Sequence, residues 1–242
     1  MQIKSKKILS KNNLKELPCN EYSVIFNTES AWHFLYNDIY RDYVLSCDNI
    51  AIDGAGLSAA LKLCGCIVKR FHGPDLCQTL IENATQSDDK ILVVGGDDSN
   101  LELVKRKLVN GFYPLPMMTG SKDFQENFEG LKTFINQFSG KKIIFVSLGL
   151  PKQELFCKWL LSELRIDRSV DCDDIIIVPV GAALDFISGH KKRSGHIWQR
   201  FGLEWLPRLI REPRMFIRVF RSFQAIVAIV FSKAVLNRNR KI

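Results

Sequence analysis

The chain has 242 residues, of which 46% are hydrophobic and 25% charged, so it suits one globular domain of ordinary core size with at most an appendage. No apolar segment follows the basic residues 1–7, so we expect no signal peptide. The seven cysteines lack the spacing of a disulfide framework or a zinc site, which predicts buried, reduced thiols in a reducing compartment.

The net charge of +8 is concentrated at one end of the chain. Residues 190–242 contain 13 Lys and Arg against two acids, whereas residues 1–189 carry more acids than bases. An acidic globule with a basic, aromatic-rich end predicts an anionic partner, which is a membrane surface, a diphosphate or a nucleic acid. We therefore divide the chain into a domain, 1–189, and an appendage, 190–242.

Short apolar runs alternate with amphipathic stretches up to about residue 185. The apolar runs predict strands at residues 23–26, 49–52, 90–94, 114–118, 142–147 and 174–178. The amphipathic stretches predict helices at residues 29–43, 55–63, 75–84, 99–108, 122–138 and 151–164, and residues 69–75 read as a loop. Because the strands lack polar alternation, we expect an α/β fold: a Rossmann-like, mostly parallel sheet with helices on both faces.

Ligands of such sheets bind beyond the carboxyl ends of the strands, where helix N-termini favour phosphate. Five loops with small and polar residues fall there, at residues 27–28, 53–54, 95–96, 149–153 and 181–183. The sequence therefore favours a phosphate-bearing ligand, and Asn27 and Thr28 open the first of these loops.

Asp53 follows an apolar strand and precedes Gly54 and Gly56. It is either the N-cap of the next helix or a carboxylate at the ligand edge, with glycines that let a substrate approach. The two glycines begin a dinucleotide fingerprint, but Ala59 stands where a third is required, so a nicotinamide site is disfavoured.

Residues 149–154 read Gly-Leu-Pro-Lys-Gln-Glu and include Lys152, Gln153 and Glu154. At a helix start on the ligand edge, a lysine can meet phosphate and an amide can bind a sugar hydroxyl, although capping and solubility also explain such residues. Arg70 can pair with a diphosphate or with Asp75.

The pair Asp171 and Asp173 spells a metal-binding motif, but it precedes its strand and so lies at the opposite edge, where we expect a solvated turn. No other acid or histidine cluster has ligand spacing. We expect neither a required metal nor a cofactor.

Arginines at 211, 214, 218 and 221 share one helical stripe, interleaved with aromatic residues and followed by the apolar run 225–231. That run is shorter than the roughly 18 residues that span a bilayer. The pattern predicts a helix lying on an anionic membrane surface, with a helix docked on the domain and its arginines solvated as the alternative. Nucleic acid is disfavoured because it leaves the apolar run without a use.

Six blocks across the chain resemble the WecG/TagA/CpsF glycosyltransferase family of bacterial surface-polysaccharide assembly. They are residues 27–29, 53–56, 70 with 73–75, 149–154, 181–189, and 202–208 with 212–214. The chain departs from the family pattern at residues 193–195 and at the pair before Gly149.

The resemblance implies inverting, metal-independent transfer of a sugar from a UDP-sugar donor to an undecaprenyl-diphosphate-linked acceptor. It implies a protein at the cytoplasmic face of the cell membrane. By position, Asp53 matches the base, and Thr28, Arg70 and Gln153 match pocket residues. The arginines of the appendage that this resemblance places near the diphosphate are Arg208, Arg214 and Arg218.

Two other classes of function remain at this stage. One is a non-enzymatic binding module that carries its basic helix to RNA or an acidic partner. The other is a sugar-nucleotide dehydrogenase or epimerase. The donor sugar, the acceptor's first sugar and any homo-oligomer are left open by the sequence.

Overall fold

The computed structural model describes residues 7–8, 22–68, 73–95, 110–113, 121–167, 171–187, 198, 205–206, 209 and 215–239. Its strands pair in parallel throughout. They are β1 (Lys7–Ile8), β2 (Ser23–Phe26), β3 (Asn49–Ile52), β4 (Lys90–Val94), β5 (Gly111–Tyr113), β6 (Lys142–Val146) and β7 (Ile175–Pro179). One group has the order β1-β3-β2 and the other β5-β4-β6-β7. A parallel bridge between Tyr22 and Ile177 joins β2 to β7.

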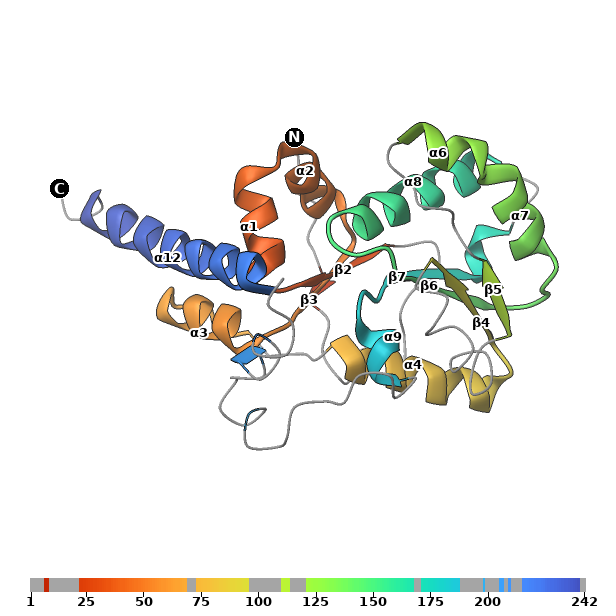
Figure 1. Ribbon diagram of the computed structural model, residues 1–242, viewed down its shortest axis with the longest axis horizontal. Helices are drawn as coiled ribbons and strands as arrows, with labels where there is room; N and C mark the ends of the chain where they lie inside the picture. The colour runs from red at the N-terminus through yellow and green to blue at the C-terminus, as the bar shows by residue number, and fades with distance from the viewer. Residues whose placement is uncertain are drawn as a thin grey trace.

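Helices cover both faces of this sheet, as the apolar strands predicted (Figure 1). They are α1 (Thr28–Tyr36), α2 (Asp38–Ser46), α3 (Ala55–Leu63), α4 (Gly73–Ser87), α6 (Ser121–Glu126), α7 (Phe128–Asn136), α8 (Lys152–Ile166), α9 (Ala183–Ile187) and α12 (Phe216–Asn239), with a 3-10 turn, η2 (Cys172–Asp174). Alternate strand residues point to opposite faces. Ile143 and Phe145 pack with α4 and α9, whereas Ile144 and Val146 pack with α2, α7 and α8. The expected α/β architecture is therefore confirmed.

The strands at 23–26, 49–52 and 90–94 and the helix at 55–63 have the bounds that the sequence predicted. The predicted helix 29–43 is wrong as one element, because the chain breaks at Asn37. The Oδ1 atom of Asn37 accepts a hydrogen bond from the Tyr40 N–H at 3.0 Å, and its own N–H caps the preceding helix at His33 O. Asparagine offers the backbone this local alternative to a continuous helix.

Other boundaries moved too. The predicted helix 122–138 ends at Glu126 and restarts at Phe128. Residues 73–75, which were predicted to belong to a loop, instead form the first turn of α4. Pro74 is tolerated there because the N–H groups of a first helical turn have no partner within the helix. The predicted helix 99–108 and strand 114–118 lie outside the described residues.

Helix α12 packs along α1 and α3 (Figure 1). Ala225 is fully buried there with Leu57 and Ala31. A Cβ on Gly56 would stand 3.1 Å from the Ile226 side chain, so this glycine lets α12 approach closely. The docked alternative is thus confirmed for one face of α12.

The thiols of Cys47, Cys77 and Cys157 are free and buried, as predicted for reduced cysteines. Cys64 and Cys66 are also free, and Cys66 is exposed. Five thiols in the described residues are therefore unbridged, and three of them belong to the core.

Candidate active site

The two groups of strands part at the carboxyl edge between β2 and β7. In the described residues their pairing is a single bridge near the amino end of β2, at Tyr22. The Ile25 carbonyl further along β2 instead accepts the Ser30 hydroxyl at 3.3 Å, in keeping with the need of buried carbonyls for a partner. The helix after β2 leads to the face of α2 and α8, and the helix after β7 leads to the opposite face. Such a switch point is where open α/β sheets bind ligands.

Asp53 stands at the end of β3 beside the end of β2, where its N–H donates to the Phe26 carbonyl at 2.9 Å. Its Oδ2 lies 3.5 Å from the Gly73 N–H, at the N-terminus of α4. That helix end favours the ionised carboxylate. The N-cap of α3 is Gly54, with φ of 88° and no side-chain cap bond, so the capping alternative for Asp53 is wrong. The half-buried carboxylate is left at the ligand edge.

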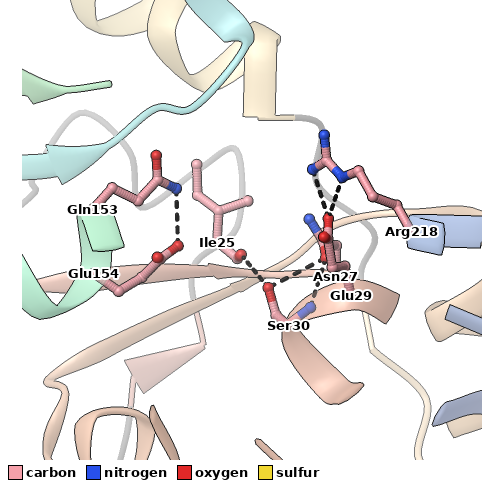
Figure 2. Close-up of polar contacts among 7 residues, drawn as sticks. All are labelled: Ile25, Asn27, Glu29, Ser30, Gln153, Glu154 and Arg218. Carbon is pink, nitrogen blue, oxygen red and sulfur yellow. Dashed lines mark hydrogen bonds and ion pairs between the residues drawn. The ribbon is translucent and has the colours of Figure 1, made fainter. Parts of the chain in front are cut away.

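Asn27 and Thr28 lie on the neighbouring strand end. The Oδ1 of Asn27 caps α1 by accepting the Ser30 N–H at 2.9 Å (Figure 2). Thr28 opens α1, and its Cγ2 lies 3.5 Å from the position of a Cβ on Gly56. The sheet therefore brings Asn27, Thr28 and Asp53 together, with the first task of Asn27 being to shape the loop.

Gln153 and Glu154 begin α8 after β6, on the other side of the switch point (Figure 2). The Nε2 of Gln153 donates to Oε1 of Glu154 at 2.9 Å. Both side chains are buried, with 7% and 1% of their surface exposed. Glu154 thus contacts Gln153 rather than the surface, and Gln153 packs against Gly181 in the loop after β7.

Burial raises the pKa of Glu154 from 4.5 to about 7, with the charge of Glu29 acting in the same direction. The amide of Gln153 acts in the opposite direction by donating to the carboxylate. No described lysine or arginine forms an ion pair with Glu154. A carboxyl without a counter-charge in the protein interior favours its neutral form.

The Glu29 carboxylate holds the appendage by binding Arg218 of α12. Its Oε2 accepts from Nε of Arg218 at 2.7 Å and from a terminal nitrogen at 2.5 Å (Figure 2). The next turn adds Arg221 stacked on the Trp32 ring at 4.5 Å, and Trp32 Nε1 donates to Gln224. Two arginines of the predicted stripe therefore face α1, so the expectation that a docked helix would keep its arginines solvated is wrong for Arg218 and Arg221.

These features coincide with a family match. Residues 9–240 match the family described as Glycosyl transferase WecG/TagA/CpsF family. The chain belongs to this family. It is therefore a glycosyltransferase, and the RNA-binding module and the dehydrogenase or epimerase are set aside.

The remaining candidate residues of this glycosyltransferase are distributed as follows. Lys152 is exposed at the start of α8, and Asp75 lies in the first turn of α4. Arg70, Arg208 and Arg214 lie outside the described residues. The 3-10 turn with Asp173 precedes β7, as predicted, and Asp171 Oδ1 accepts the Asp173 N–H at 3.0 Å. Within the described ranges, no group of three or more His, Cys, Asp or Glu side chains is placed to hold a metal ion.

Sequence reasoning missed two residues that contact or adjoin the candidate site. Glu29 lies in a block that resembles the family, but its partner is 189 residues away. Tyr40 is fully buried, and its pKa is raised by burial and by the charge of Glu154. A tyrosine within an amphipathic helix reads as core, so no signal in the sequence pointed to this neighbour of Glu154.

Proposed function

We propose that this glycosyltransferase transfers a sugar from a UDP-sugar to an undecaprenyl-diphosphate-linked sugar, with inversion, during assembly of a bacterial surface polysaccharide. The observation that carries the proposal is the half-buried carboxylate of Asp53 at the carboxyl edge, beside the N-terminus of α4 and next to the loop of Asn27 and Thr28. Asp53 after β3 and Gln153 after β6 lie on opposite sides of the switch point, and the proposal places the sugar nucleotide between them.

Asp53 is proposed as the general base. The acceptor hydroxyl oxygen attacks the anomeric carbon from the side opposite UDP, and a new glycosidic C–O bond forms. The bond between that carbon and the diphosphate oxygen breaks, and UDP leaves with the electron pair. The hydroxyl proton passes to Asp53, and such a positioned base contributes about 10²–10⁴-fold to the rate.

The departing diphosphate gains negative charge. The proposal assigns the stabilisation of this charge to helix N-termini and to cationic side chains of the chain itself. The N-terminus of α3 is capped by Gly54 without a side-chain bond. Lys152 lies at the start of α8. The other terminal nitrogen of Arg218, which does not bind Glu29, is proposed to meet the diphosphate together with Arg70, Arg208 and Arg214.

The exposed face of α12 supports contact with an anionic membrane surface. Its apolar side chains recur at helical spacing, and they are Phe216, Phe220, Phe223, Val227 and Phe231. Each is at least 48% exposed, on the side away from Arg218 and Ala225. A contiguous exposed apolar face of this kind marks an interaction surface. No helix in the described ranges is long and apolar enough to cross a membrane.

The test is UDP release by the full-length protein, with a panel of UDP-sugars and an undecaprenyl-diphosphate-sugar analogue in anionic vesicles. We expect release that requires both substrates, a product of inverted anomeric configuration and insensitivity to chelator. Absence of UDP release with every donor would refute the reaction. Loss of turnover with chelator would refute the metal-independent mechanism alone.

A further inference from the structure

The Gln153–Glu154 pair has more buried hydrogen-bond acceptors than its contacts with the described residues satisfy. Oε1 of Gln153 and Oε2 of Glu154 are buried, and neither has a hydrogen-bond partner among the described residues. Buried polar atoms are nearly always hydrogen-bonded, so an unsatisfied pair at the ligand edge of a sheet points to a bound group. The Gln153 amide lies against the loop after β7, with Oε1 3.5 Å and Nε2 3.6 Å from the position that a Cβ on Gly181 would take.

The two ends of a glutamine side chain have opposite hydrogen-bonding character. Nε2 only donates and Oε1 only accepts, while an ionised carboxylate accepts only. Because Nε2 of Gln153 donates to Glu154 at 2.9 Å, Oε1 is turned away from Glu154 (Figure 2). When Glu154 is ionised, reversing the amide would bring two acceptors together. The orientation of Gln153 is therefore set by its neighbour on the same helix.

We propose that Glu154 is a positioning residue, which holds the Gln153 amide so that Oε1 accepts a hydrogen bond from a hydroxyl or amide N–H of the bound sugar. The proposal rests on the glycosyltransferase reaction above and deepens it. It selects sugars with a hydrogen-bond donor at the position that meets Oε1. A sugar that carries only an acceptor there would leave two oxygens in contact and bind poorly.

Among the described groups in this neighbourhood, Glu154 is the one whose charge is expected to change near neutral pH. Tyr40 and Tyr43 face it from α2, and Cys157 faces it from α8. Burial raises the pKa of all three, so they stay neutral. Glu29 is held by Arg218. Burial lowers the pKa of His33, whose ring contacts Tyr40, and so favours its neutral form.

The first measurement is NMR of the Gln153 side-chain NH₂ in ¹⁵N-labelled full-length protein, identified by its loss in Gln153→Ala. We expect its shifts to titrate with a midpoint at about 7, the pKa of Glu154. The titration should vanish in Glu154→Gln and persist in Glu163→Gln, which removes a carboxyl from the same helix. Gln153 NH₂ shifts that are the same in Glu154→Gln as in the wild type at every pH would overturn the proposal.

The second measurement is a double-mutant cycle on kcat/KM for the donor, with Glu154→Leu and Gln153→Ala. If Glu154 acts through Gln153, we expect Gln153→Ala to lose about tenfold and Glu154→Leu several-fold. The double variant should then be no worse than Gln153→Ala. If the kcat/KM losses of the two single variants multiply in the double variant, Glu154 has a purely structural role and the proposal is overturned. If the wild type transfers no sugar, the reaction fails, and the NMR titration still decides whether Glu154 orients Gln153.

Discussion

The two halves of the sheet's carboxyl edge use a carboxyl group in opposite ways. On the β3–β2 half, Asp53 is half-buried and lies against a helix N-terminus, which favours its charge. On the β6–β7 half, Glu154 is 1% exposed and lacks a counter-charge among the described residues, which raises its pKa to about 7. The contrast teaches that environment rather than residue type separates the proposed proton acceptor from the carboxyl that is proposed to orient its neighbour.

The strongest test of the contrast is Asp53→Asn. We expect transfer to fall by about 10²–10⁴-fold because the base is lost, while stability changes by less than about 1 kcal/mol. UDP release and thermal unfolding measure the two effects. Asp171→Asn, at the opposite edge, is the matched control and should be active. Near-normal turnover of Asp53→Asn would remove Asp53 from this role.

Glu154→Gln tests the other half through stability. The folded protein holds the Glu154 proton up to about pH 7, whereas the unfolded chain releases it near 4.5. The wild type should therefore lose stability as pH rises between these values, by at most about 3 kcal/mol, relative to Glu154→Gln. Denaturant unfolding at several pH values measures the difference. A difference that does not change with pH would show that Glu154 is ionised throughout.

The described helix of the appendage, α12, lies over the β3–β2 half, where it packs on α1 and α3. Replacing Phe220 and Phe223 by alanine should weaken binding to anionic vesicles by about tenfold, since both rings are more than half exposed and available to lipid. Vesicle sedimentation measures this, with Ile166→Ala on α8 as the control. Unchanged binding would reject the exposed face of α12 as the lipid contact.

Truncation after Gly189 is a poorer test of the same idea. It removes Ala225 from the core cluster with Leu57 as well as the exposed face of α12. A loss of activity would then mix a packing defect with a loss of membrane contact. The surface substitutions separate the two.

Arg218→Ala should have the smallest effect of these substitutions. We expect it to lower the free energy of unfolding by about 0.5–1 kcal/mol, because the Arg218 side chain is 51% exposed in its pair with Glu29. Hydrogen exchange should become faster in α12 and α1 and stay unchanged in α8. Lys158→Ala on α8 is the control. Faster exchange spread evenly over the sheet would indicate that the ion pair supports the whole domain rather than the β3–β2 half.

Much of the fold was predictable because unbroken apolar runs have few alternatives to a buried parallel strand. The strands at 23–26, 49–52 and 90–94 match to the residue. The helix breaks at Asn37 and Asn127 were not predicted, because asparagine is only a weak helix breaker and amphipathic periodicity continues across both. Asn37 became a boundary because its side chain caps α2.

The site divides in the same way. The chemistry of Asp53 and Gln153 and their place at one edge follow from their positions after apolar strands, which local sequence determines. The pairing of Glu29 with Arg218 and the burial of Glu154 beneath Tyr40 come from tertiary structure alone. Sequence specifies which groups are present and on which element they sit, but desolvation and long-range pairing depend on how separate elements pack. The proton affinity of a carboxyl and the free or engaged state of an arginine are therefore decided only in the folded chain.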